Sequence, residues 1–140
     1  MTPKTGGCLC GAVRYELAAE PIVQVACHCR ACQRASGGSP TLGMVVPKAA
    51  LKITQGEPRY YWSAGDTGAK VGRAFCEVCG APVFSEPAVN PDIAVIKIGS
   101  LDDPSAFAVQ MDMWMAAAQP WHRPHDGAAR FDGNPTLGGE

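Results

Sequence analysis

Seven cysteines in a chain of 140 residues narrow the possible folds more than any other feature of this sequence. They form three tight groups: Cys8 and Cys10, then Cys27, Cys29 and Cys32, then Cys76 and Cys79. Because seven is odd, a complete disulfide framework would leave one thiol over. A single cysteine is often just a small buried residue, but these cysteines are grouped. A C-x-x-C pair can also be a redox motif, but no βαβ pattern of the thioredoxin type accompanies the C-x-x-C pairs of this sequence. We therefore interpret the groups as metal ligands, with zinc as the expected ion.

Spacing alone leaves the partition of the ligands open. Structural zinc is usually held by four ligands from two pairs, whereas catalytic zinc keeps three protein ligands and one open position. One partition gives a closed site of Cys8, Cys10, Cys76 and Cys79 and an open site of Cys27, Cys29 and Cys32. A zinc ribbon that joins Cys29 and Cys32 to Cys76 and Cys79 is also possible. His28 could join a site, but in an extended segment it would point away from the cysteines on either side.

The composition favours one globular domain over residues 1–140, with a loose tail over 126–140 that is rich in Gly, Pro and Asp. The formal net charge of −1 makes nucleic acid an unlikely main partner. No apolar run approaches the roughly 18 residues of a membrane span, and residues 1–7 contain no signal-peptide core. We expect a cytoplasmic location, where thiols stay reduced and free to bind metal.

Alternating apolar and polar residues predict mainly short strands. The segments that show the pattern or a strand-like apolar or aromatic run are 13–17, 23–27, 41–46, 51–54, 60–62, 93–98 and 107–115. Segments 70–75 and 82–85 lead into and out of the Cys76–Cys79 turn, and residues 29–35 could form a short helical turn. The fold class expected is all-β, with antiparallel sheets packed on each other and little helix.

Four motifs, in order along the chain, resemble the glutathione-dependent formaldehyde-activating enzyme family. They are GCLCGAVRY at 7–15, CHCRACQR at 27–34, RAFCEVCG at 73–80 and GSLDDP at 99–104, followed by Trp114 and Pro120-Trp121. The resemblance implies a β-tent fold and two zinc ions per chain. It implies a structural zinc on Cys8, Cys10, Cys76 and Cys79, and a reactive zinc on Cys27, Cys29 and Cys32. Many relatives carry a histidine two residues before the tryptophan, where this chain has Asp112.

The activity that the resemblance implies is that of a zinc-dependent carbon–sulfur lyase, which combines glutathione with formaldehyde to give S-hydroxymethylglutathione. Cys27, Cys29 and Cys32 would be the reactive residues, and the partners would be a small thiol and an aldehyde. Arg30 and Arg34 could bind a substrate carboxylate, although surface arginines of this kind are commonly just solvated. The alternative is a binding module for a protein or nucleic acid, in which both zinc ions serve structure only.

Overall fold

The computed structural model describes residues 3–65 and 67–135. Eleven strands are seen in this part of the chain: β1 (Lys4–Gly7), β2 (Arg14–Leu17), β3 (Val23–Cys27), β4 (Thr41–Pro47), β5 (Leu51–Gln55), β6 (Arg59–Ala64), β7 (Lys70–Phe75), β8 (Pro82–Pro87), β9 (Ile93–Lys97), β10 (Met111–Met113) and β11 (Ala129–Arg130). The described residues contain one α-helix, α1 (Arg30–Ser36), and the 3-10 turns η1 (Lys48–Ala50), η2 (Ile98–Ser100) and η3 (Met115–Ala117). The all-β prediction is confirmed.

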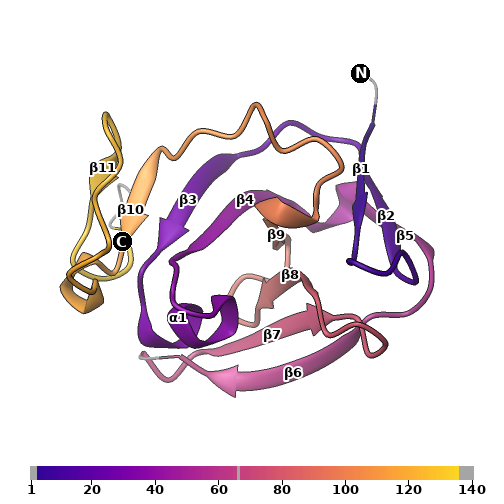
Figure 1. Ribbon diagram of the computed structural model, residues 1–140, viewed down its shortest axis with the longest axis horizontal. Coiled ribbons are helices and arrows are strands. Elements are labelled where there is room, and N and C mark those ends of the chain that lie inside the picture. The colour runs from indigo at the N-terminus through magenta and orange to yellow at the C-terminus, as the bar shows by residue number, and fades with distance from the viewer. Residues whose placement is uncertain (1–2, 66, 136–140) are drawn as a thin grey trace.

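The strands form two sheets. A small sheet has the order β1-β2-β5, and a large sheet has the order β11-β10-β3-β4-β9-β8-β7-β6. In Figure 1 the small sheet stands on the right of the view, and the large sheet runs from β11 on the left to β6 at the bottom. Most neighbouring strands are antiparallel, but β10 pairs in parallel with both β3 and β11.

The main core lies between the two sheets. The small sheet contributes Tyr15 and Leu17, and the large sheet contributes Met44, Val46 and Ile96, all almost completely buried. Since side chains alternate between the faces of a strand, the neighbours of these residues in β4 and β9 point to the other face of the large sheet. One face of the large sheet therefore builds the core, and the other is free to build a site.

The helix begins and ends where local chemistry dictates. The Cys29 side chain accepts a hydrogen bond from the backbone N–H of Cys32, as an N-cap does, at 3.3 Å. At the other end Gly37 takes a left-handed conformation with φ of 85°, which glycine adopts without strain. The short helical turn predicted over residues 29–35 is thus found as α1.

Two regions differ from the sequence predictions. The alternation over 107–115 predicted a long strand, but only Met111–Met113 pairs, because the residues before it are largely exposed and have no partner strand among the described residues. The predicted loose tail contains β11, since the N–H groups of Ala129 and Phe131 donate to the carbonyls of Gln110 and Asp112, next to and within β10. Residues 136–140 lie outside the described residues.

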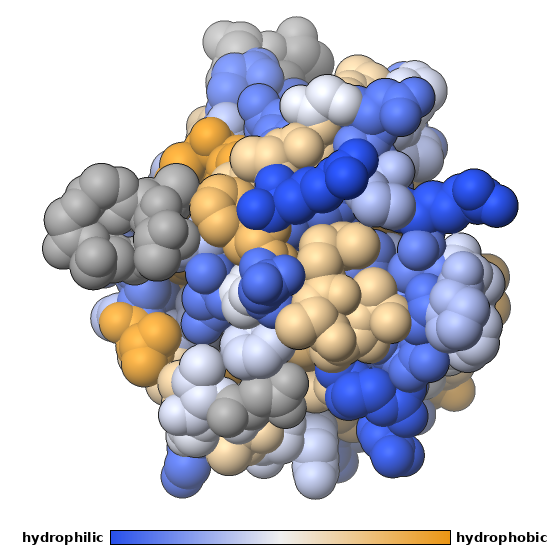
Figure 2. All heavy atoms as spheres, turned by 90° about the vertical axis from the view of Figure 1, so that its left-hand side faces the viewer, coloured by the Kyte–Doolittle hydropathy of each residue, from blue (hydrophilic) through white to orange (hydrophobic). Residues whose placement is uncertain are grey.

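β11 forms one edge of the large sheet, on a side of the molecule that is mainly hydrophilic. Figure 2 shows this side, with blue residues over most of it and a mildly hydrophobic patch near the centre. No helix among the described residues is long and apolar enough to cross a membrane.

Candidate metal centres

The first cysteine cluster joins the two sheets. Cys8 and Cys10 lie in the turn between β1 and β2, and Cys76 and Cys79 lie in the turn between β7 and β8. The four sulfur atoms are all within 4.8 Å of one another. The Sγ of Cys10 is 3.7 Å from that of Cys8 and 3.8 Å from that of Cys76. The two turns, more than 60 residues apart in sequence, thus bring four thiols to one point.

These distances fit a zinc tetrahedron. With zinc–sulfur bonds of about 2.3 Å, two sulfurs of a tetrahedron lie about 3.8 Å apart. The cluster also has the backbone donors that thiolates need: the N–H of Val13 lies 3.2 Å from the Sγ of Cys8, and that of Val78 lies 3.4 Å from the Sγ of Cys76. The residues in this cluster could therefore hold zinc as a closed site.

Hydrogen bonds lower the pKa of two thiols in this cluster, Cys79 and Cys8. The backbone N–H of Ala81, with further help from Cys10, lowers the pKa of Cys79 to about 6. Burial works to raise the pKa of Cys8, but the N–H of Val13 and the neighbouring thiols lower it on balance. Hydrogen bonds to the thiolate favour the charged form, which is the form that binds metal.

The second cluster is built where β3 passes into α1. Cys27 is the last residue of β3, Cys29 caps the helix, and Cys32 lies in its first turn. The strand-to-helix turn brings the three sulfurs within 4.8 Å of one another. No fourth histidine, cysteine or carboxylate ligand joins this group among the described residues. The donor set fits a metal ion with one position left for another ligand.

The three thiols of this cluster share charge unequally. Hydrogen bonds from Cys27 and Cys29 lower the pKa of Cys32 to about 2, and Thr41 and Lys97 act in the same direction. The pKa of Cys27 is raised by hydrogen bonds with Cys29 and Cys32 and by burial. One thiolate is therefore favoured, and the charge of a divalent ion is what would allow all three to ionise.

A cavity of about 630 Å³ opens beside this second cluster. Its wall includes the face of the large sheet that points away from the core, with Val25 and Cys27 of β3, Thr41 and Val45 of β4 and Val95 of β9. Strand alternation explains this: Val95 faces the cavity while Ala94 and Ile96, on either side of it, are fully buried in the core. The three cysteines thus line a hollow rather than a closed interior.

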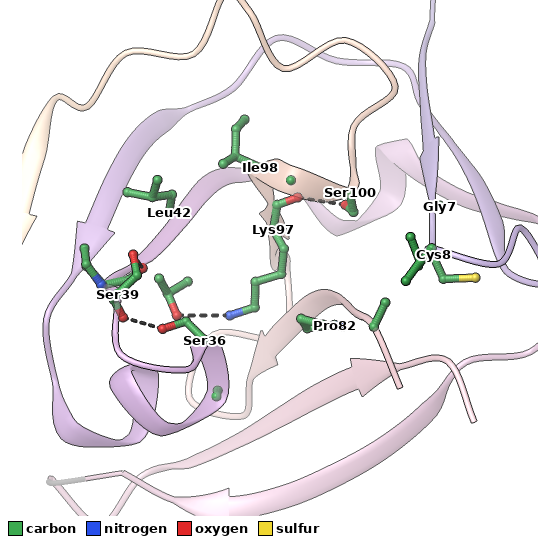
Figure 3. A pocket seen from close by; sticks show the side chains of 15 residues that line it. Gly7, Cys8, Ser36, Ser39, Leu42, Pro82, Lys97, Ile98 and Ser100 are labelled. Carbon is green, nitrogen blue, oxygen red and sulfur yellow. Dashed lines mark hydrogen bonds between the residues drawn. The ribbon is translucent and has the colours of Figure 1, made fainter. Parts of the chain in front are cut away.

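Lys97 lines the same cavity as this cluster. It is the last residue of β9, is half-buried, and its Nζ donates a hydrogen bond to the Oγ1 of Thr41 at 3.3 Å. Thr41 in turn pairs with Cys27 across strands β3 and β4 and bonds to Cys32. Lys97 also lines a second cavity of about 500 Å³, and Figure 3 shows its extended side chain there. The sequence motifs gave no reason to select Lys97.

His28 is held by a carboxylate on the opposite side of the chain from the sulfurs. It is fully buried, and its Nε2 lies 2.8 Å from the Oδ1 of Asp112. The same oxygen lies 2.9 Å from the Nδ1 of His125, and the backbone N–H of His125 donates to the Oδ2 at 2.7 Å. These distances are those of hydrogen bonds, so the group locks β3, β10 and the His125 turn together. His28 is not among the residues of the cysteine cluster, in agreement with the prediction that it points away.

Several residues singled out in the sequence do not line the cavity beside the cysteines. Arg30 and Arg34 are exposed, and Arg30 bonds to the side chain of Gln33. His122 bonds to the N–H of Gln119 and to the carbonyl of Gly38 instead of pointing to the sulfurs. Trp121 is 66% exposed. Trp114 does contribute to the cavity wall.

The fold and the two clusters define a β-sheet protein with two candidate thiolate metal centres. The family model described as glutathione-dependent formaldehyde-activating enzyme matches residues 3–117, so the chain belongs to this family. The resemblance seen in the motifs is confirmed, and membership suggests a glutathione-dependent formaldehyde-activating role.

A solved structure of a Rhodobacter sphaeroides protein is similar in fold. It is 22% identical in sequence, with a TM-score of 0.57, and the match covers 70% of this chain and 87% of that one.

Proposed function

We propose that the protein is a zinc-dependent carbon–sulfur lyase that forms or cleaves the adduct of a thiol and an aldehyde, such as S-hydroxymethylglutathione. Cys8, Cys10, Cys76 and Cys79 hold a structural zinc in this proposal. Cys27, Cys29 and Cys32 hold a reactive zinc.

The observation that carries the proposal is the position of the three-cysteine cluster. It lies in the wall of a cavity of about 630 Å³, and among the described residues it has no fourth protein ligand. The four-cysteine cluster, by contrast, already has the number of ligands that zinc needs. An incomplete ligand set beside an open cavity is the arrangement of catalytic zinc sites.

Zinc at this site would keep the sulfur of a bound thiol ionised at neutral pH. In the direction of synthesis, a sulfur lone pair forms the new bond to the aldehyde carbon, and the carbonyl π pair moves to the oxygen. That oxygen takes up one proton, which replaces the proton that the thiol lost, so the sum is thiol plus aldehyde giving a hemithioacetal, which for formaldehyde is a hydroxymethyl thioether.

The protein's own residues orient this exchange. The cysteines fix where the sulfur can lie, and Val25, Val45 and Val95 give the cavity apolar walls. Lys97 and Thr41 provide N–H and O–H donors on the same side as Cys32. Donors placed beside developing negative charge on oxygen lower the barrier to its formation.

The test is zinc content and exchange rate measured together. We expect two zinc ions per chain in the wild-type protein and one in Cys27→Ala. NMR exchange spectroscopy should show faster interconversion of glutathione and S-hydroxymethylglutathione with the wild-type protein than with Cys27→Ala. Two zinc ions in both proteins, with no acceleration by either, would contradict the proposal and favour a zinc-stabilised binding module.

A further inference from the structure

The cavity beside Cys27, Cys29 and Cys32 is lined by several basic side chains. Its lining includes Lys70, Arg73 and Lys97, and no aspartate or glutamate among the described residues that line it. Lys70 is exposed at the start of β7, whereas Arg73 and Lys97 are half-buried. Two partly buried cations therefore face a hollow in which the described lining residues include no carboxylate.

Neither cation forms an ion pair with a carboxylate within the described part of the chain. The ion pairs found there involve other basic residues, and Arg73 and Lys97 are in none of them. Arg73 donates from Nη1 to the Oγ of Ser63 at 2.9 Å, and Lys97 donates to Thr41, so each has only a neutral partner. A guanidinium presents five donors in a planar fork, and one hydroxyl leaves most of them unused.

Burial makes this arrangement costly for Lys97. Loss of solvent lowers its pKa, and the nearby cysteine charges only oppose that effect. Buried charges are normally paired, because an unpaired one loses its hydration without compensation. A bound anion would supply the missing partner.

The sheet register places the two cations two strands apart and offset by two residues. Arg73 of β7 is opposite Ser85 of β8, and Ser85 is opposite Val95 of β9, two residues before Lys97. With neighbouring strands about 4.8 Å apart, Arg73 and Lys97 start from strands separated by about 10 Å across the sheet. Their long side chains can both reach a small anion between them. Lys97 also borders the second cavity, shown in Figure 3.

We propose that Lys97 and Arg73 bind a carboxylate of the substrate, so that the site selects an anionic reactant over a neutral one of the same size. This inference rests on the proposed function for the identity of the reaction, but not for the existence of the anion site. The carboxylate can belong to the thiol or to the aldehyde, and the chemistry of recognition is the same: a charge-assisted, two-point contact with an Arg and a Lys.

The thiol arm of the test compares 3-mercaptopropionate with 2-mercaptoethanol by isothermal titration calorimetry on the zinc-loaded protein. If the thiol carries the carboxylate, 3-mercaptopropionate should bind more tightly by roughly ten- to a hundredfold, as expected for a hydrogen-bonded charge pair. The preference should disappear in Lys97→Met and fall in Arg73→Met. Lys97→Arg should keep part of it. Lys52→Met, which removes one positive charge from the exposed face of β5 in the other sheet, should leave the preference unchanged.

The aldehyde arm compares glyoxylate with acetaldehyde, each with 2-mercaptoethanol, by the rate of adduct formation and by protection of the protein against thermal unfolding. If the aldehyde carries the carboxylate, glyoxylate should be preferred in this arm, and Lys97→Met should abolish that preference while zinc content stays at the wild-type value. Zinc content and melting temperature of each variant separate a binding defect from a folding defect.

No preference for the charged compound in either arm, in a zinc-loaded wild-type protein, would overturn the inference. So would a preference that Lys97→Met and Arg73→Met leave intact. The two proposals fail in different ways: tight binding of the charged compounds without any turnover contradicts the proposed function alone, and turnover without charge preference contradicts the anion site alone.

Discussion

The two cysteine clusters use the same ligand chemistry in opposite structural settings. The four-cysteine cluster is made by two tight turns from different sheets, and its sulfurs complete a tetrahedral set by themselves. The three-cysteine cluster is made by one continuous segment, β3 into α1, and lies against a cavity lined by cations. In the first cluster the fold supplies every ligand, and in the second it leaves one place beside open space.

Under the proposed function, this difference lets one kind of metal ion serve two purposes in a small domain. A site whose ligands come from distant turns adds long-range cross-links, so metal binding there is coupled to folding. A site whose ligands come from one short segment closes only a small loop and adds little to the fold. It can therefore exchange its fourth ligand without a large cost in stability.

The largest effect is expected for Cys76→Ala. It removes a buried ligand of the four-cysteine cluster, and structural zinc sites contribute about 10–16 kcal/mol of apparent binding free energy in peptides that fold with the metal. We expect loss of the zinc and a melting temperature lower by about 10 °C or more, measured by circular dichroism and metal analysis. A variant that melts like the wild-type protein would show that this cluster does not support the fold.

The next effect is expected for Cys27→Ala, which removes one ligand of the three-cysteine cluster. The rate of carbon–sulfur exchange should fall at least about a hundredfold. The melting temperature should change by only a few degrees, because a metal ion bound to residues 27–32 closes only a short loop and therefore stabilises the fold little. The exchange assay measures the rate, and differential scanning calorimetry measures the melting temperature. A fall in melting temperature equal to that of Cys76→Ala would remove the contrast between the clusters.

Asp112→Asn should act on one cluster only. The carboxylate holds His28, the residue between two of the three cysteines, so its loss should let the backbone that carries Cys27 and Cys29 shift. We expect weaker zinc binding at the three-cysteine cluster, seen as earlier release to a chelator in competition. The zinc of the four-cysteine cluster serves as the internal control. Equal weakening of both ions would mean that the substitution had loosened the whole fold.

The smallest effect is expected at the ion pair that ties β2 to the turn after η2. Arg14 donates from Nη1 to the Oδ1 of Asp102 at 2.9 Å, and Thr5 donates to the Oδ2 at 2.6 Å. These bonds lower the pKa of Asp102 to about 2, from 3.8. Because the pKa is lower in the folded state, the contribution is complete above about pH 4 and is lost as the pH falls toward 2.

Since the pair is partly exposed, Asp102→Asn should reduce the free energy of unfolding by less than about 1 kcal/mol at pH 7. Urea unfolding at pH 7 and at pH 3 measures this free energy. The difference in free energy of unfolding between the wild-type protein and Asp102→Asn should be smaller at pH 3 than at pH 7. A gap that widens on acidification would contradict this account. Zinc content at both clusters should not change at pH 7.

Much of the strand content follows from local pattern. Segment 23–27 forms β3 with the predicted bounds, and segments 41–46 and 93–98 differ from β4 and β9 by one residue at one end. These segments alternate or are largely apolar, and a strand that packs one face on a core needs only that local pattern. β1 was not predicted, because the sequence KTGG carries no alternation, and its pairing with β2 depends on the neighbouring strand.

The candidate site was predictable in its ligands but not in its surroundings. The cysteine groups could be read from spacing and from the family resemblance, and the structure brings them together in the groups of four and three that the resemblance implied. Asp112 stands out in sequence only as a polar residue among methionines. Asp112 is fully buried and bonds to His28, which lies 84 residues away in the sequence. No local pattern predicts such a contact.

The sequence by itself determined the ligand types, their close spacing and the face of each strand that a side chain takes, because each depends on residues only a few positions apart. The tertiary structure alone decided that the two distant cysteine pairs meet, that the three-cysteine cluster faces a cavity, and that Arg73 and Lys97 line that cavity without a carboxylate partner among the described residues. Those features depend on strand order and register, which are set by how the whole chain buries its apolar surface.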